Sequence, residues 1–241
     1  MSRQVVVTGG SSGIGRAVAA RFARSGDRVI ITGRDTGKLE RTAAELGVRG
    51  VRCDNCDAAD VEELAARVAG EVDVLVNAAG ANTDVLRTDH NPPTLKEIAD
   101  AWRANFDANL FSAVLTTNAF LPRLVEGASV VTVGSGAAEV AATSYGAAKA
   151  ALAAWTAGVS ALVGPRGVTA NTAVPGYTEG TDFFPVPLPD HQRTALLAAA
   201  HNRRAGTPDD IAGLVFFLAG PDARHITGQA IHVNGGAHIT R

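Results

Sequence analysis

The chain has 241 residues, of which 46% are hydrophobic and 19% charged, a balance that excludes an intrinsically disordered or fibrous protein. Its formal net charge is −2 and its Lys and Arg residues are scattered, so we expect no nucleic-acid partner. We find no signal-peptide core and no apolar stretch that approaches the length of a membrane span, so we expect a cytoplasmic protein without a membrane partner.

Seven short apolar runs are predicted to be strands, and most are separated by helix-length segments rich in alanine, leucine, arginine and glutamate. The runs are Val5–Val7, Val29–Thr32, Val48–Cys53, Val72–Val76, Val130–Val133, Val168–Ala173 and Ala230–Val233. Strands that alternate with helices predict a parallel sheet covered on both faces. We therefore expect an α/β fold, a doubly wound three-layer sandwich with a mostly parallel seven-stranded sheet, formed by a single domain over residues 1–241.

Two polar or proline-rich segments interrupt this alternation, Asn82–Pro93 and Gly176–Arg204. Each follows a predicted strand, and the loops after the carboxyl ends of parallel strands form the ligand crevice in open sheets of this kind. We expect both segments to be walls of a substrate site, with a substrate lid at about 176–204.

A glycine-rich sequence, Thr8-Gly9-Gly10-Ser11-Ser12-Gly13-Ile14-Gly15, stands directly after the first predicted strand and before a helical pattern. Glycines at such a turn allow close approach of the backbone to a pyrophosphate, and the helix N-terminus offers free N–H groups to the anion. Glycines also make ordinary turns. The position between a strand and a helix favours dinucleotide binding.

The end of the second strand bears on which dinucleotide is bound. It reads Thr32-Gly33-Arg34-Asp35, and an arginine at this point accepts the 2′-phosphate of NADP where an acidic residue would bind the 2′-hydroxyl of NAD. Arg34 therefore favours NADP(H), with NAD(H) as the alternative. A shifted register would bring Asp35 to the ribose instead, and Arg34 would then be a solvated loop residue.

Tyr145 and Lys149 are four residues apart in an alanine-rich helical segment, so their side chains share one face. A nearby ammonium favours the phenolate, and we expect Lys149 to lower the pKa of the Tyr145 hydroxyl so that it exchanges a proton near neutral pH. The alternative is a surface helix with an ordinary tyrosine and lysine.

The order of these motifs resembles the short-chain dehydrogenase/reductase superfamily, of the single-domain type with a Tyr-x-x-x-Lys signature. The sequences Asn77-Ala78-Ala79-Gly80, Pro175-Gly176 and Val233-Asn234-Gly235-Gly236 are also similar to elements of that family. The resemblance implies a Rossmann fold and an oxidoreductase that moves a hydride between a nicotinamide and a small carbonyl or alcohol substrate.

The resemblance also implies roles for individual residues. Tyr145 would give or take the proton, Lys149 would also bind the nicotinamide ribose, Ser135 would bind the substrate oxygen, and Asn109 would hold a water. The residues implied in cofactor binding are Gly9, Ser11, Ser12, Gly13, Ile14, Gly15, Arg34, Asp54, Asn77, Ala79, Gly80, Tyr145, Lys149, Pro175, Gly176 and Thr178. Two alternatives stay open: Asp54 as a turn-forming residue, and Asn109 as a helix residue bonded to nearby backbone.

Three departures from the family pattern concern the substrate side. Ser135 lies closer to Tyr145 than is usual, which predicts a more open pocket. Ala78 replaces the second asparagine of the Asn-Asn-Ala-Gly element and puts a sheet-stabilising hydrogen bond in doubt. A longer segment before Trp102 predicts an added loop around Leu86–Pro93.

No metal site is expected. Cys53 and Cys56 have the spacing of a redox pair or half of a zinc site, but no second pair of ligands completes it. We interpret Cys53 as the end of a strand and Cys56 as part of the following turn.

An NADP(H)-dependent oxidoreductase is the leading functional prediction. The alternatives are an NAD-dependent polyol or steroid dehydrogenase and a non-catalytic dinucleotide-sensing protein. The helix Tyr145–Val163 carries little charge beyond Lys149, which is typical of a buried interface, and we expect a homotetramer, with a homodimer as the alternative.

Overall fold

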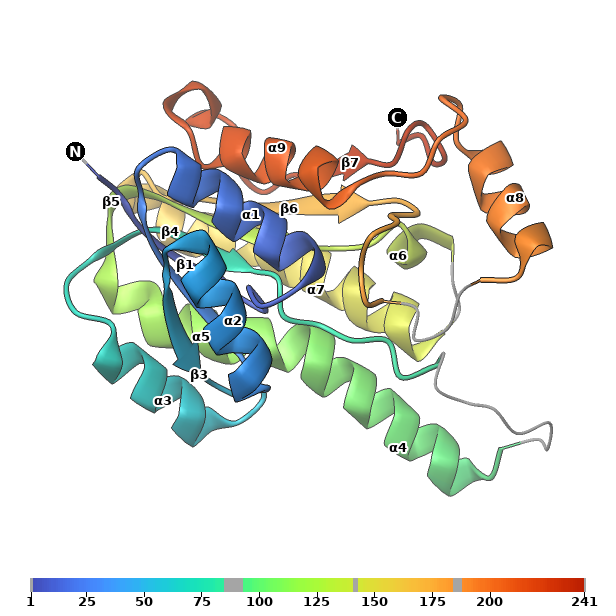
Figure 1. Ribbon diagram of the computed structural model, residues 1–241, viewed down its shortest axis with the longest axis horizontal. Helices are drawn as coiled ribbons and strands as arrows, with labels where there is room; N and C mark the ends of the chain where they lie inside the picture. Colours follow the sequence, from blue (N-terminus) through green and yellow to red (C-terminus); the bar gives the residue numbers. More distant parts are fainter. Residues whose placement is uncertain (1, 85–92, 141–142, 184–187, 241) are drawn as a thin grey trace.

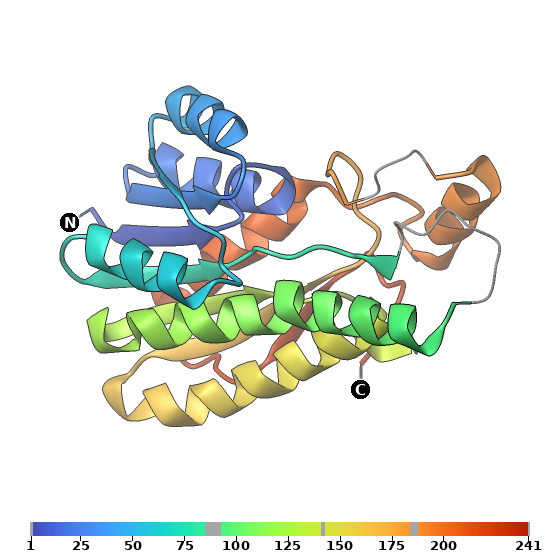
Figure 2. The same ribbon diagram turned by 90° about the horizontal axis from the view of Figure 1, so that it is seen from below.

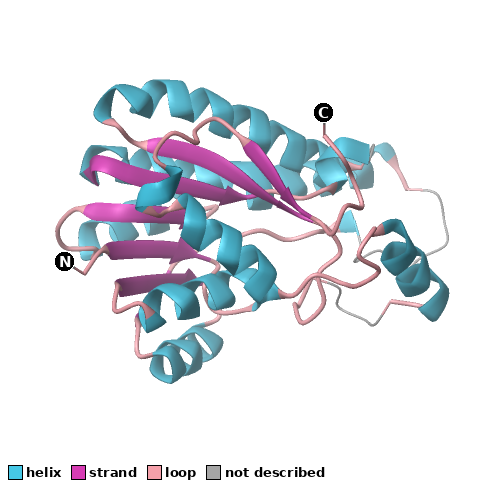
Figure 3. Ribbon diagram, turned by 90° about the horizontal axis from the view of Figure 1, so that it is seen from above, coloured by secondary structure: helices cyan, strands magenta, loops and turns pink. Residues whose placement is uncertain are grey.

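A seven-stranded parallel sheet forms the centre of the computed structural model, which describes residues 2–84, 93–140, 143–183 and 188–240. The strand order is β3-β2-β1-β4-β5-β6-β7, and every neighbouring pair is parallel (Figure 1; in Figure 3 the magenta arrows share one direction). The strands are β1 (Gln4–Thr8), β2 (Arg28–Gly33), β3 (Arg49–Arg52), β4 (Val72–Asn77), β5 (Leu124–Val133), β6 (Thr169–Pro175) and β7 (Ala230–Val233). The prediction of a doubly wound sheet is confirmed, and the sheet is parallel throughout rather than mostly so.

Helices cover both faces of the sheet. One face carries α1 (Gly13–Arg24), α2 (Thr36–Leu46) and α9 (Pro208–Leu218). The other carries α3 (Ala58–Arg67), α5 (Ser112–Phe120) and α7 (Ser144–Val163), with α4 (Leu95–Phe106) lying beside α7 (Figure 2). A π-helical turn, Asp107–Phe111, joins α4 to α5. The short α6 (Ala137–Val140) follows β5, and α8 (Asp190–Ala199) lies between β6 and α9.

The valine-rich strands are buried because each serves two cores at once. Successive side chains of a strand point to opposite faces of the sheet. Val5 and Val7 belong to the core that includes α1 and α9, whereas Val6 belongs to the core that includes α3, α5 and α7, and none of the three is accessible to solvent. This accounts for runs of apolar residues without polar alternation, as expected where both faces are covered.

The long apolar helix requires a correction to the sequence analysis. Residues Ser144–Arg166 form a helical stretch of 23 residues that is long and apolar enough to cross a membrane by length and composition. The expectation that no segment approaches this length was therefore wrong. The core helix of a soluble protein meets the same criterion, and here α7 packs against β6 and α4.

Two predicted features fall partly outside the described residues. The expected loop Leu86–Pro93, and with it most of the wall Asn82–Pro93, lies in residues 85–92, and the segment 176–204 lacks a description of 184–187. The two cysteines are as interpreted from the sequence: Cys53 is buried directly after β3, Cys56 lies in the following turn, and both are free thiols.

Candidate functional site

The glycine-rich turn between β1 and α1 can be built only with glycines. Gly9 has a φ of 64°, and a Cβ there would lie 2.8 Å from the Cα of Ala79. A Cβ on Gly15 would lie 2.3 Å from the carbonyl oxygen of Gly9. The turn is therefore packed directly against the end of β4, at the point where the chain order of the sheet reverses between β1 and β4.

The first turn of α1 has the character of an anion site. Ser12 occupies the N-cap position and its side chain makes no capping hydrogen bond, so the first amides of α1 are left for another acceptor. Ser11 is held by Thr42, whose hydroxyl donates to the Ser11 carbonyl at 3.1 Å. The predicted pyrophosphate contacts, residues 11–15, thus lie at this helix N-terminus, where 11–14 are half-buried and Gly15 is buried, and this arrangement fits a dinucleotide.

Thr8 connects the glycine-rich turn to Ala78 and Ala79, which follow β4. Its hydroxyl accepts hydrogen bonds from the backbone N–H groups of Ala78 and Ala79, at 3.1 and 3.0 Å. The side chain of Asn77 is buried and donates to Thr117 at 2.9 Å. Ala78 itself is therefore connected to β1 through its backbone, although it lacks the family's second asparagine side chain.

The residues after β2 and β3 are more exposed. Arg34 is exposed directly after Gly33, as predicted. The carboxylate of Asp35 caps α2 by accepting from the backbone of Lys38 at 2.9 Å, which commits it to the helix and disfavours its alternative role at the ribose. Asp54 accepts from the backbone of Cys56 at 3.1 Å, so it forms the turn that was its alternative interpretation; its role in cofactor binding stays a prediction.

Lys38 was missed by the sequence analysis. It follows Arg34 by four residues in the chain and lies in the first turn of α2. Its ammonium pairs with Asp182 from the segment after β6. The fold thus supplies a second basic residue from α2, in addition to Arg34. A basic residue four positions after Arg34 was the available signal.

Ser135, Tyr145 and Lys149 are brought together at the carboxyl ends of β5 and β6. Tyr145 and Lys149 are 7% and 5% exposed, and the Ser135 hydroxyl is near enough to the Tyr145 hydroxyl to lower its pKa. The ammonium of Lys149 donates to the carbonyl of Val133 at 2.9 Å and lies 5.8 Å from the centre of the Tyr145 ring. The alternative of a surface helix is excluded by this burial.

The charge states of this pair differ from the expectation. Burial raises the pKa of the Tyr145 hydroxyl to about 12, with the bond to Ser135 acting in the opposite direction, and burial lowers the pKa of Lys149 to about 8. The predicted lowering of the tyrosine pKa by Lys149 is thus wrong for this structure. The ammonium lies over the aromatic ring, and desolvation is the largest influence on the pKa of the hydroxyl.

Asn109 completes what we call the Tyr145 cluster: Asn109, Ser135, Tyr145 and Lys149. Its amide nitrogen donates to the carbonyls of Ala81 and Asn105, at 2.6 and 2.9 Å, within the π-helical turn. Its buried Oδ1 has no partner among the residues that the structure describes. A Cβ on Gly80 would lie 2.8 Å from this oxygen and 3.4 Å from the Lys149 nitrogen, so both polar atoms face the same space.

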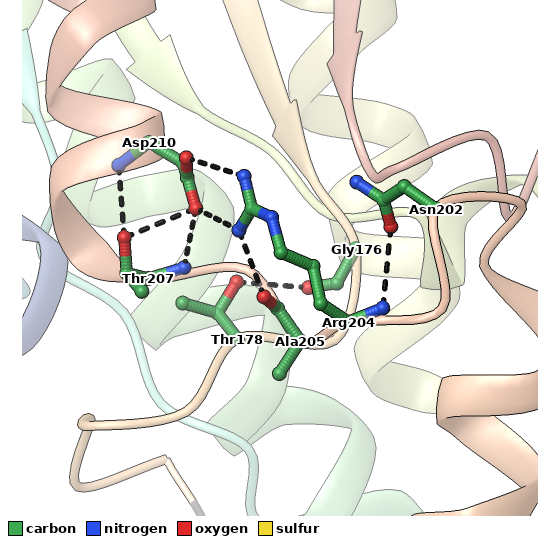
Figure 4. Close-up of polar contacts among 7 residues, drawn as sticks. All are labelled: Gly176, Thr178, Asn202, Arg204, Ala205, Thr207 and Asp210. Carbon is green, nitrogen blue, oxygen red and sulfur yellow. Dashed lines mark hydrogen bonds and ion pairs between the residues drawn. The ribbon is translucent and has the colours of Figure 1, made fainter.

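The segment after β6 is fastened at its base (Figure 4). The Thr178 hydroxyl donates to the carbonyl of Gly176 at 3.1 Å, and Thr178 forms an isolated parallel β-bridge with Gly206. Arg204 forms two hydrogen bonds with Asp210, at 2.6 and 2.9 Å, and holds the pKa of that carboxyl well below its usual range. The predicted residues Pro175, Gly176 and Thr178 thus lie where the chain leaves the sheet.

Comparisons with known proteins agree with this site. The family model described as enoyl-(acyl carrier protein) reductase matches residues 9–238. The chain is 36% identical over 239 residues to a Mycobacterium tuberculosis protein whose name describes it as an oxidoreductase, covering 97% of both chains. It is 32% identical over 244 residues to the 3-oxoacyl-[acyl-carrier-protein] reductase FabG of Escherichia coli, covering 97% of this chain and 96% of that protein.

A solved structure is equally similar. A short chain dehydrogenase from Burkholderia cenocepacia in complex with NADP has a TM-score of 0.85 and 33% identity, with 98% of this chain and 97% of that chain covered. The chain belongs to the short-chain dehydrogenase/reductase family. It is an NAD(P)-dependent oxidoreductase that acts on C=O or CH–OH groups.

Proposed function

We propose that the protein is an NADP(H)-dependent reductase or dehydrogenase in which Tyr145 exchanges the proton with the substrate oxygen. The observation that carries the proposal is the buried Tyr145 cluster beside the glycine-rich turn. The cofactor, when bound, supplies or accepts the hydride. Gly9, Ser11–Gly15, Asn77, Ala79 and Gly80 would hold it, together with Asp54, Pro175, Gly176 and Thr178.

The side chains of the cluster divide the remaining work. The Ser135 hydroxyl is near enough to the Tyr145 hydroxyl to lower its pKa, so both hydroxyls can donate to one substrate oxygen and stabilise the charge that develops on it. With its pKa raised by burial, Tyr145 stays protonated near neutral pH and is suited to donate a proton in the reductive direction. Lys149 and the free Oδ1 of Asn109 can hold a water that returns a proton to the site.

The preference for NADP(H) rests on the basic residues of the β2–α2 region. Arg34 and Lys38 provide two positive groups four residues apart in the chain, one before the start of α2 and one in its first turn, whereas Asp35 is engaged in capping α2. A guanidinium binds a phosphate through paired charge-assisted hydrogen bonds and gains less from a hydroxyl. NAD(H) use on polyols or steroids is the alternative, and the ratio of kcat/KM for the two cofactors decides between them.

The substrate class is tested by an assay of NADPH oxidation. The FabG relatives make a 3-oxoacyl thioester the first compound to try, and acetoacetyl-coenzyme A is a soluble one. A panel of aldehydes and ketones extends the assay. Turnover of none of them, together with tight NADPH binding, would instead support the alternative of a non-catalytic dinucleotide sensor.

The assembly, the lid and the location of the protein belong to the same proposal. Four large apolar side chains on α4, the π-helical turn and α7 are 42–85% exposed: Leu95, Trp102, Phe111 and Leu162. Assembly into a homotetramer or a homodimer would cover them. We expect the protein to be cytoplasmic, with residues 1–241 as one domain and 176–204 as the substrate lid. Sedimentation that shows only monomer at micromolar concentration would contradict this assembly.

A further inference from the structure

One carboxylate outside the Tyr145 cluster holds the first turn of α7. Oδ1 of Asp84 accepts from the hydroxyl of Ser144 at 2.5 Å and from the amide of Asn105 at 3.0 Å. Oδ2 accepts from the backbone N–H of Tyr145 itself, at 3.1 Å. Residues from the loop after β4, from α4 and from α7 therefore meet at a single side chain, and we call these four residues the Asp84 network.

The network is closed and mostly buried. Asn105 and Ser144 are 0% and 3% exposed, and the Asn105 amide also donates to the Ser144 hydroxyl at 2.7 Å. The oxygen of the Asn105 side chain accepts from the backbone of Thr83 at 3.1 Å. Every donor and acceptor of the Asn105 amide is thus used, which fixes its orientation. The carboxylate also stands at the N-terminus of α7, where the helix dipole favours a negative charge.

The same network reaches a second member of the Tyr145 cluster. The backbone carbonyl of Asn105 accepts from the side chain of Asn109 at 2.9 Å, and that bond helps to turn the free Oδ1 of Asn109 toward Gly80 and Lys149. Asp84 therefore connects the turn that carries Tyr145 with the turn that carries Asn109. Neither Asp84 nor Asn105 touches the reacting groups.

We propose that Asp84 is a positioning residue, which sets the place of the Tyr145 hydroxyl relative to Ser135 by fixing the first turn of α7 through Ser144 and the Tyr145 backbone. The inference rests on the proposed function of Tyr145. Ser135 follows β5 and Tyr145 lies in the first turn of α7, so the position of one hydroxyl relative to the other depends on how that turn is held from the side of β4. Without Asp84, two side-chain bonds are left at this turn among the residues that the structure describes: Thr143 accepts from the N–H of Gly146 at 3.1 Å, and Ser144 accepts from the Asn105 amide at 2.7 Å.

The decisive variant is Asp84→Asn, which keeps the shape and puts an amide nitrogen where a carboxylate oxygen meets donors. We expect kcat with NADPH and acetoacetyl-coenzyme A, or whichever panel carbonyl is turned over, to fall about 10- to 100-fold, because small displacements of reacting groups are costly. The dissociation constant for NADPH should change less than about threefold, since the glycine-rich turn is untouched.

Asp73→Asn is the matched control. Oδ2 of Asp73 accepts from the backbone of Gln4 at 2.7 Å, at the opposite end of β4. The substitution is the same and a backbone bond is also lost, so stability should fall while kcat of the folded fraction stays unchanged. A fall in kcat for Asp73→Asn equal to that for Asp84→Asn would mean that general loss of stability is the cause.

The position of Tyr145 can be read without any substrate. The chain has only two tyrosines, so 3-fluorotyrosine gives two ¹⁹F signals, which Tyr177→Phe assigns. We expect the Tyr145 signal to shift in Asp84→Asn and not in Asp73→Asn. An unmoved signal, or a kcat within twofold of the unaltered enzyme, overturns the proposal.

The test remains decisive if Asp84→Asn does not fold or if the proposed function itself is wrong. If Asp84→Asn does not fold, Ser144→Ala replaces it: the Tyr145 N–H bond is kept, and we expect a loss of about three- to tenfold in kcat and a smaller shift of the same signal. Unchanged values there also overturn the proposal. Failure of the proposed function looks different, because the unaltered enzyme would then turn over no compound of the panel while the ¹⁹F signal still reports the placement of Tyr145.

Discussion

The Tyr145 cluster and the β2–α2 region, at two places along the carboxyl edge of the sheet, are built on different principles. At one end Asn109, Tyr145 and Lys149 are 1–7% exposed and held by hydrogen bonds from three elements. At the other end Arg34 is exposed, and the ion pair of Lys38 with Asp182 has side chains that are 38% and 68% exposed. Desolvation therefore controls the first end, and screened charge controls the second.

This difference in burial determines how strongly a substitution at each end should change activity or stability. Burial moves the pKa of Tyr145 up to about 12 and that of Lys149 down to about 8, changes large enough to alter which group carries a proton. Exposed charges contribute less per pair and lose strength as salt is added. Changes at the buried end should thus be large and insensitive to salt, and those at the exposed end smaller and sensitive to it.

Tyr145→Phe should have the largest effect. Only the hydroxyl is removed, so we expect kcat to fall by about 10²–10⁴-fold, as for the loss of a general acid, while NADPH affinity changes little. Tyr177→Phe is the control, because its hydroxyl bonds Glu179 at the base of the segment after β6. Turnover retained in Tyr145→Phe would remove this residue from the chemistry.

Lys149→Met should reveal the cost of the buried ammonium as a dependence of stability on pH. The folded pKa of about 8 lies below the unfolded value of 10.5, so the native state loses its proton first and stability rises with pH between these values. The full penalty, about 3 kcal/mol, applies below pH 8, and there the variant should be the more stable protein by up to that amount.

The measurement for Lys149 is urea unfolding at pH 7 and pH 9.5. The advantage of Lys149→Met should shrink at the higher pH, whereas Lys96→Met, at a side chain that is 85% exposed, should show no such change. Above pH 10 the raised pKa of Tyr145 has the opposite effect, because the unfolded state then loses its proton first and stability falls toward pH 12. Equal stability differences at both pH values would contradict the buried charge.

Arg34→Ala tests the exposed end. If Arg34 meets the 2′-phosphate, the unaltered enzyme should prefer NADP(H) by about ten- to a hundredfold in kcat/KM, and the variant should lose most of that preference. Adding Gly33→Asp should move the preference toward NAD(H), although the new Cβ lies 2.8 Å from the Ser11 hydroxyl, which must rotate away. An unaltered enzyme that already prefers NAD(H) would identify Arg34 as a solvated loop residue.

Asp182→Asn should have the smallest effect of the series. It frees Lys38 from its ion pair, so NADPH should bind about two- to fivefold more tightly at low ionic strength, and the gain should vanish in about 0.5 M salt. Isothermal titration at two salt concentrations measures both. A gain that persists at high salt would mean that Asp182 acts through the conformation of its segment rather than through charge.

Much of the fold followed from local patterns. The apolar runs predicted all seven strands, and the pattern is clearest in β1 and β2, which are buried on both faces. The helix from Pro208 begins where its Thr207–Asp210 capping box places it. The glycine turn was likewise readable, since its positive φ angles and close contacts admit glycine alone. The four-residue spacing put Tyr145 and Lys149 on one helical face for the same reason: the geometry is local to the helix.

What only the tertiary structure decided involves residues far apart in the chain. Asp35 could be assigned to the cap of α2 only once its contacts were present, and Lys38 meets Asp182 across 144 positions. Asp84 reaches Ser144 across 60 positions, and no spacing rule connects a loop carboxylate with a distant helix N-terminus. The shift in the pKa of Tyr145 was predicted in the wrong direction, because the sequence indicates that an ammonium is nearby but not that the hydroxyl is buried. Helix and strand patterns are set by neighbours within a few residues, whereas desolvation and side-chain partners depend on which segments the sheet order brings together.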